Sequence, residues 1–211
     1  MWVARALEAR YATPDLGNKA DAVDEVVFIA LTRQTHEANA GRSWAAVAAA
    51  GGPEALVRMK ERTLVRLLAP GGLARQKAQW IRGALLRIKE TFGELSLRGT
   101  AGWADQRVES FLCTLPGVSI KSAKCVMMYS LGRKVLPVDV HVRRVAERLG
   151  LVSPGLSERE IHSVLEALIP SGMRRAFHVN TVCHGRTLCK PARPQCDVCP
   201  LARHCAFHRQ T

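Results

Sequence analysis

The chain has 211 residues, and 47% of them are hydrophobic, so it can bury a core without crosslinks. No window approaches the roughly 20 continuous apolar residues of a membrane helix, and MWVARALEAR is interrupted by arginine too early for a signal peptide. We therefore expect a cytoplasmic protein. Its 31 basic residues outnumber 18 acidic ones, and the net charge of +13 favours a polyanionic partner over a merely solvated basic surface.

Apolar residues recur every three or four positions along most of the chain and almost nowhere alternate at two, which predicts an all-α protein. Short stretches with proline or glycine separate the periodic segments and end the helices. The predicted helices cover about residues 20–38, 43–50, 53–59, 61–68, 73–92, 102–113, 120–131, 139–149, 157–168 and 172–184. After about residue 185 the helical pattern stops, and proline and cysteine become frequent.

The stretch LPGVSIKSAK, residues 115–124, connects two predicted helices. Pro116 and Gly117 end the first helix, and Ser119 is placed to cap the second. The same turn directs unpaired backbone N–H groups outward, where the helix dipole favours an anion. A helix connection alone explains the residues, but in a chain of charge +13 the turn is also a candidate phosphate site.

Lys121 falls in the first turn of the second helix, where the positive end of the dipole disfavours another positive charge. Its amine pKa is therefore expected to be depressed, as a nucleophilic lysine requires. Lys124, one turn further on, is expected to be solvated or to face phosphate. In the following segment VLPVDVHVRRVAERLG, Asp139 begins the next helix, and capping alone could explain it.

Four cysteines near the C-terminus, Cys189, Cys196, Cys199 and Cys205, have the spacing C-x6-C-x2-C-x5-C. Thiolates this close together, in a segment with few apolar residues, indicate a metal centre. Zinc and a cubane iron-sulfur cluster are both possible, with free thiols as a third reading. A zinc ribbon usually pairs two C-x2-C knuckles, and only one is present, so the spacing favours the cluster.

The remaining cysteines and the nearby histidines are expected to be structural. The cysteines at 113, 125 and 183 lie in apolar helical patterns and fit buried small side chains. The histidines at 184, 204 and 208 are expected on the surface or around the thiolates, because four thiolates already complete a ligand set.

Three separated motifs resemble the endonuclease III family of helix-hairpin-helix DNA glycosylases. They are LPGVSIKSA, PVDVHVRRV, and HGR followed by the four-cysteine tail, and the resemblance runs from about residue 20 to 207. It implies an all-α fold of two helical domains with the active site in the cleft between them. Residues 20–133 would form a six-helix barrel domain ending in the helix-hairpin-helix. Residues 1–19 and 134–211 would form a terminal helical domain with a 4Fe-4S cluster on the four cysteines.

The resemblance also implies roles for individual residues. Lys121 matches the family's lysine nucleophile and Asp139 its catalytic aspartate. The expected DNA contacts fall into four groups: the hairpin backbone, the residues that fill the gap left by a flipped nucleotide, the PVDVHVRRV motif and the cysteine loop. The hairpin backbone contributes Gly117, Val118 and Ser119, and Gln34 and Leu73 would fill the gap. His141 belongs to the PVDVHVRRV motif, and Lys190 and Arg193 belong to the cysteine loop.

The function implied is that of a bifunctional DNA glycosylase and AP lyase of base excision repair. It would act as a monomer on double-stranded DNA containing oxidised pyrimidines or abasic sites, associated with the nucleoid if the source is bacterial. A monofunctional mismatch or adenine glycosylase is disfavoured, since such relatives usually lack a lysine at the position of Lys121. A non-catalytic DNA-binding relative would not need to retain both Lys121 and Asp139.

Three positions depart from the family pattern. Ser119 stands where the family usually has a second hairpin glycine, which would strain the backbone by about 1 kcal/mol if the position needs a positive φ. Val140 replaces a threonine, and Gly-Gly-Leu-Ala around Leu73 replaces a tyrosine-containing loop. Weak activity or an altered lesion range is the expected consequence.

Overall fold

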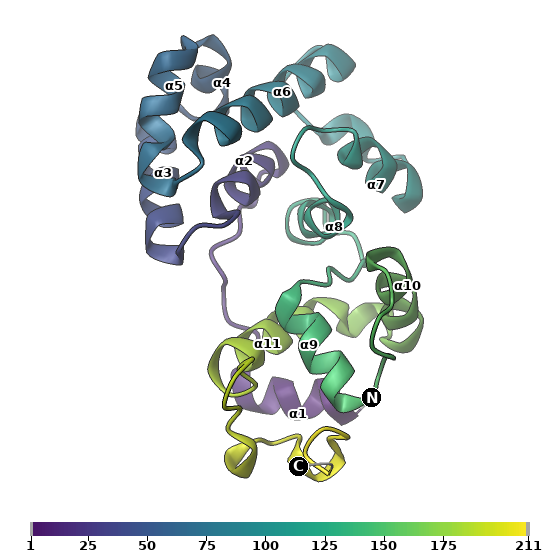
Figure 1. The fold of residues 1–211 in the computed structure, drawn as a ribbon. Helices are drawn as coiled ribbons and strands as arrows, with labels where there is room; N and C mark the ends of the chain where they lie inside the picture. Colours follow the sequence, from purple (N-terminus) through teal and green to yellow (C-terminus); the bar gives the residue numbers. More distant parts are fainter. Residues whose placement is uncertain (1, 210–211) are drawn as a thin grey trace. The chain divides into compact units, whose positions relative to one another are not determined.

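The computed structural model describes residues 2–209, and the regular elements within that range are α-helices and short 3-10 helices (Figure 1). The all-α class predicted from the hydrophobic periodicity is confirmed. The chain forms two compact units. The middle unit is Asn18–Arg133, and the terminal unit combines Met1–Gly17 with Lys134–Thr211. Within residues 2–209, no helix has both the length and the hydropathy to cross a membrane.

The middle unit is a helical assembly arranged around α2 and the long helix α6. Helix α6 packs against α2, α4 and α5, and α8 packs against α2 and α7. Its helices are α2 (Ala22–Thr32), α3 (Glu37–Ala49), α4 (Gly52–Arg58), α5 (Glu61–Leu68), η1 (Ala69–Gly71), α6 (Ala74–Phe92), η2 (Arg98–Thr100), α7 (Asp105–Cys113) and α8 (Ile120–Tyr129).

The single helix predicted over residues 20–38 is wrong at its C-terminal end. Helix α2 stops at Thr32, because Arg33 takes an extended backbone with ψ of 123° and Gln34 takes a left-handed φ of 48°. The apolar pattern of the segment ends at Leu31, so the polar residues after it carry no packing preference that would prolong the helix. The resulting loop before α3 exposes Gln34.

The terminal unit is built around α11. Figure 1 shows α1 beside α11, two segments from opposite ends of the sequence, and α9 packs on α11 as well. The elements are α1 (Trp2–Tyr11), α9 (Val140–Leu149), α10 (Glu158–Leu168), η3 (Ser171–Met173), α11 (Arg174–Thr187), η4 (Cys196–Val198) and η5 (Ala202–His204).

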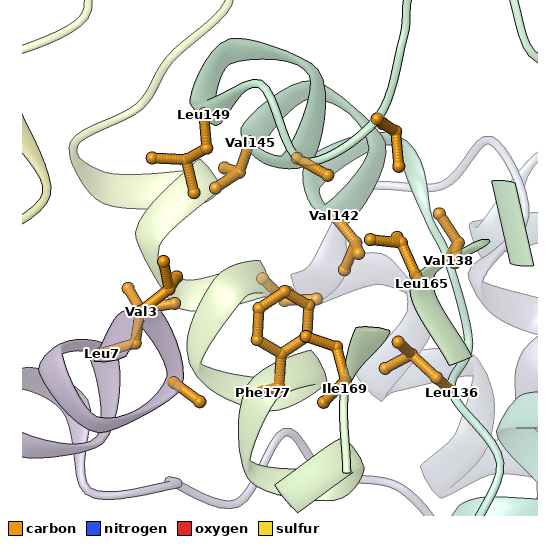
Figure 2. Close-up of a cluster of buried hydrophobic side chains, with 14 of the residues drawn as sticks. Val3, Leu7, Leu136, Val138, Val142, Val145, Leu149, Leu165, Ile169 and Phe177 are labelled. Atoms are coloured by element: carbon orange, nitrogen blue, oxygen red, sulfur yellow. The ribbon is translucent and has the colours of Figure 1, made fainter. Parts of the chain in front are cut away.

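Side chains from all four α-helices of the terminal unit form its core. Leu7 of α1, Val142 of α9, Leu165 of α10 and Phe177 of α11 are each no more than 1% exposed and lie in one cluster (Figure 2). Helix α1 is absent from the predicted elements, although Val3, Ala4 and Leu7 share one helical face and are all buried. Residues 2–11 are therefore part of the fold.

Leu7→Ala should lower the free energy of unfolding by about 2–5 kcal/mol, because it removes buried methyl groups and leaves a cavity against α11. Arg5→Ala, on the exposed face of the same helix, should change it by no more than about 0.5 kcal/mol. Urea denaturation of both variants provides the measurement. Equal stabilities would mean that α1 does not contribute to the core in solution.

Candidate functional site

The turn between α7 and α8 needs glycine at position 117 for two reasons. Gly117 has a left-handed φ of 78°, and a Cβ added there would lie 2.7 Å from the Trp80 ring. The N–H of Val118 donates to the carbonyl of Leu115 at 3.1 Å and closes the turn. The backbone can follow this path only because residue 117 has no side chain.

Ser119 begins α8 without backbone strain. Its φ of −90° and ψ of 173° are extended values that any residue adopts, and its hydroxyl accepts from the N–H of Ser122 at 3.4 Å. The capping role predicted for Ser119 is therefore confirmed. The conditional expectation of strain does not apply, because this position does not require a positive φ.

Arg33 supports the same turn from the end of α2. Its Nη1 donates to the carbonyl oxygen of Gly117 at 2.6 Å, and its guanidinium stacks over the Trp80 ring at 4.5 Å from the centroid. Arg33 and Gly117 are 84 positions apart, and no sequence signal pointed to this contact. The turn is thus held between an indole ring and a guanidinium.

Lys121 is half-buried in the first turn of α8, and its charge acts on a buried carboxylate. That group is Glu25 of α2, which is 0% exposed; it accepts from the Lys19 N–H at 2.7 Å and from Asn18 Nδ2 at 2.5 Å. Burial raises the pKa of Glu25 to about 7, whereas its hydrogen bonds and the charge of Lys121 oppose the rise. Sequence reasoning missed Glu25, which follows Asp24 in the first turn of α2 and is the acidic residue that directly precedes the apolar run from Val26 to Leu31.

The prediction that Lys124 is solvated or faces phosphate is wrong. Lys124 is 6% exposed, neither solvated nor available to phosphate, and its Nζ lies 3.1 Å from Glu109 Oε2 on α7. The physical reason is that α8 is surrounded by other helices, and every residue from Ser122 to Met128 is buried. Lys124 therefore joins α7 to α8.

Gln34 and Leu73 both project from loops with left-handed backbones. Their φ values are 48° and 49°, and Leu73 is 44% exposed although it is a large apolar residue. Gln34 is exposed in the loop after α2, and Leu73 precedes α6. A residue that enters a duplex must be exposed, as both of these are, and the exposure of Leu73 excludes a core role for it.

Asp139 caps α9, as its sequence position predicted. Its Oδ1 accepts from the N–H groups of His141 and Val142, both at 2.9 Å. Val140, the residue that replaces the family's threonine, is 70% exposed. The carboxylate of Asp139 is thereby fixed at the start of the helix.

Two buried histidines hold the segment that leads to Asp139. The N–H of Val138 donates to His162 Nε2 at 3.0 Å, and His178 Nδ1 lies 2.9 Å from the carbonyl oxygen of Pro137. Since His162 Nε2 accepts, its proton resides on Nδ1, which bonds the carbonyl of Glu158 at 2.7 Å. Helices α10 and α11 thus supply partners that an extended segment would otherwise find in a sheet.

His141 packs between α9 and α11. The Nδ1 of His141 accepts from Arg144 Nη2 at 3.1 Å. A Cβ added to Gly185 of α11 would lie 2.8 Å from the Cβ of His141, so the two helices are in close contact here. Burial lowers the pKa of His141, so the ring is neutral at neutral pH. Its contact with DNA stays a prediction.

The four tail cysteines line one cavity, together with apolar side chains that include Leu149, Leu188 and Leu201. Within residues 2–209, however, no three Cys, His, Asp or Glu side chains converge closely enough to bind a single metal ion. Burial raises the pKa values of the Cys196 and Cys199 thiols, and neighbouring thiols raise them further. Thiols of this kind stay protonated at neutral pH unless a metal displaces the proton.

Two arginines of α9 hold the cysteine loop. Arg148 Nη1 donates to Cys189 Sγ at 3.3 Å and to the Lys190 carbonyl at 2.7 Å, and Arg144 Nε donates to the Cys189 carbonyl at 2.9 Å. Lys190 and Arg193 are exposed on this loop. The loop thus presents basic side chains outward while its backbone is fixed to α9.

His184 lies behind the cysteines and is 1% exposed, so it is no surface residue. Its Nδ1 bonds the Tyr11 hydroxyl at 3.0 Å, and its Nε2 lies 3.6 Å from Cys199 Sγ. Burial, with a smaller effect from Arg10, lowers its pKa to about 4. A neutral His184 therefore packs against the cavity wall.

Comparison with known proteins places the chain in a family. Residues 27–171 match the HhH-GPD superfamily base excision DNA repair protein family. Endonuclease III of Thermotoga maritima is 33% identical over 158 residues, which cover 75% of this chain and 70% of that protein. Endonuclease III of a Synechocystis species is 36% identical over 140 residues, which cover 66% and 59%.

A solved structure has the same fold. An endonuclease III in a non-covalent complex with DNA matches with a TM-score of 0.85 at 23% identity, covering 99% of this chain and 94% of that one. At this identity the likeness concerns the fold alone. On the sequence matches, the chain belongs to the endonuclease III family within the HhH-GPD superfamily of base excision DNA repair proteins.

Proposed function

We propose that this protein is a bifunctional DNA glycosylase and AP lyase that removes oxidised pyrimidines from double-stranded DNA. The observation that carries the proposal is the setting of Lys121, which is half-buried in the first turn of a helix that a glycine turn opens. A lysine held in this way suits covalent catalysis better than a solvated surface role.

The first step is extrusion of the damaged nucleotide, because its sugar and base cannot be reached inside the duplex. Gln34 and Leu73 fill the vacated space, which suits their exposed positions on two loops of the middle unit. The Gly117 turn grips a phosphate. Since the Val118 N–H is used within the turn, the N–H groups of Gly117 and Ser119 are the proposed donors.

The chemical step is attack of the neutral Lys121 amine on C1′ of the extruded nucleotide. A C1′–N bond to lysine forms, the glycosidic bond breaks, and the base leaves with its electron pair and takes up a proton. Asp139 activates the amine or stabilises positive charge on the sugar. The sugar ring opens to an imine, the C2′ proton is lost, and the 3′ phosphate leaves by β-elimination, which cuts the strand 3′ to the lesion.

We also propose that Cys189, Cys196, Cys199 and Cys205 hold a 4Fe-4S cluster. The four thiols line one cavity, and their segment carries only one C-x2-C knuckle, which fits a cubane whose four irons each take one thiolate better than a zinc ribbon. The cluster would shape the loop that carries Lys190 and Arg193, and neither base removal nor strand cleavage needs it as a reactant.

Lys121→Gln should abolish the borohydride-trapped complex with a lesion-bearing duplex and reduce strand cleavage by about 10³-fold or more, because the imine cannot form. Lys89→Gln, an exposed change of the same type on α6, should leave both unchanged. Gel analysis with and without borohydride measures the two products. Trapping that persists in Lys121→Gln would place the nucleophile elsewhere.

The double change Lys190→Ala and Arg193→Ala should weaken duplex binding and make it less salt-dependent. The slope of log K against log salt should become shallower by about 1.8, since each lost phosphate contact removes roughly 0.9. Fluorescence anisotropy at several salt concentrations measures the slope. The exposed pair Lys60 and Lys89, changed to alanine, is the control, and an unchanged slope in the loop variant would contradict its contact with DNA.

The purified protein should be yellow-brown, with absorbance near about 410 nm and about four irons per chain. Cys199→Ser should lose most of this absorbance, whereas Cys113→Ser should keep it, because Cys113 lies outside the loop, at the end of α7. Cys113 is exposed there, so the burial expected for it was wrong. Metal analysis by mass spectrometry provides the count. A colourless preparation containing zinc would overturn the proposed cofactor.

A further inference from the structure

Lys77 is fully buried, at 0% exposure, although lysine is rarely found without solvent. It lies in the first turn of α6, and burial lowers the pKa of its amine. A buried ammonium group is stable only when its donors are satisfied. Nζ of Lys77 donates to the carbonyl oxygens of Leu31 at 2.7 Å and Gly71 at 2.8 Å, and to the Thr35 hydroxyl.

These three acceptors lie in the last turn of α2, in the loop after it and in the turn before α6. Leu31 and Thr35 bracket the loop after α2, and Gly71 lies in the η1 turn before α6. The Thr35 hydroxyl also donates to the Gly71 carbonyl at 2.6 Å, so the two loops are joined directly as well as through Lys77. A Cβ on Gly71 would lie 2.8 Å from Ser43 Oγ, which shows how closely the η1 backbone is packed.

Each of the joined loops carries one residue with a left-handed backbone. Gln34 precedes Thr35, and Leu73 lies two residues after Gly71; their φ values are 48° and 49°. Such a conformation is unfavourable for residues other than glycine and persists where the surroundings over-determine it. The hydrogen bonds of Lys77 supply that constraint for both loops at once.

We propose that Lys77 is a positioning residue that fixes the loops of Gln34 and Leu73 together, so that both side chains are preformed for insertion into duplex DNA. The inference rests on the proposed function, in which these two residues fill the gap left by an extruded nucleotide. Lys77 itself is buried and touches no substrate. Fixing both loops in advance removes the ordering entropy that the two insertions would otherwise require.

A duplex whose abasic position holds the uncleavable tetrahydrofuran analogue, with 2-aminopurine opposite, tests this without chemistry. Insertion of Gln34 and Leu73 unstacks the opposite base and raises 2-aminopurine fluorescence. Lys77→Met keeps the apolar stem and removes the donors. It should abolish most of the rise and weaken duplex binding by about tenfold, while affinity for the single-stranded analogue, which has no opposite base, changes less than about twofold.

Two further variants keep the result interpretable. Lys89→Met makes the same substitution on the exposed face of α6 and should behave like the wild type. Thr35→Val removes the hydroxyl that accepts from Lys77 and donates to the Gly71 carbonyl. It should reduce the fluorescence rise and the duplex affinity less than Lys77→Met does, and it tests the inference if Lys77→Met does not fold. The inference would be overturned if the fluorescence rise were unchanged in both Thr35→Val and Lys77→Met. It would also be overturned if the variants lost affinity equally for both DNA forms, or if the wild type showed no rise.

Strand cleavage of a lesion-bearing duplex by the wild type is measured separately. If Lys77→Met loses the fluorescence rise that the wild type shows, and the wild type cleaves no lesion, the role of Lys77 is supported and the proposed enzymatic function is overturned. The two failures are therefore distinguishable.

Discussion

The close approach of the Gly117 backbone to Trp80 determines where α8 begins, and the proposed chemistry depends on that position. No side chain fits between the turn and the indole ring, and the left-handed φ of Gly117 turns the chain into the helix. Lys121 follows within one helical turn. Because Arg33 stacks on the same ring and binds the Gly117 carbonyl, the end of α2 is tied to the hairpin, and Gln34 is the next residue along. The hairpin, the proposed nucleophile and one proposed insertion residue thus share one support.

Each charged side chain that is buried in the middle unit joins separate segments of the chain. Glu25 binds the segment before α2, Lys124 pairs with Glu109 between α7 and α8, and Lys77 joins two loops. Buried charges are poor sources of net stability, because their desolvation offsets much of their attraction. Each of them instead makes contacts that an apolar side chain could not, to a backbone group or to an opposite charge. We infer that Glu25, Lys124 and Lys77 fix the positions of helices and loops.

The features that could be predicted from the sequence are those that depend on residues close together in the chain. The helical periodicity, and the caps at Ser119 and Asp139, depend on neighbours within a few residues, and the structure confirms them. Lys124 was wrongly expected in solvent because its burial depends on α7 and α2 packing around α8. Arg33, Glu25 and Lys77 were missed for the same reason, since their partners or packing surfaces lie in other elements. The roles of Lys121, Asp139 and the four cysteines remain predictions drawn from the family motifs.

In the terminal unit, α9 carries both the proposed catalytic aspartate and the support of the cysteine loop. Asp139 caps its first turn, and Arg144 and Arg148 reach from its later turns to the backbone around Cys189. A change in loop conformation therefore acts on a helix whose other end fixes a carboxylate. The 136–138 segment opposes such a movement, because His162 and His178 hold its backbone to α10 and α11. A cluster in this loop can thus be structural and still affect activity, since the loop and the Asp139 cap are attached to the same helix.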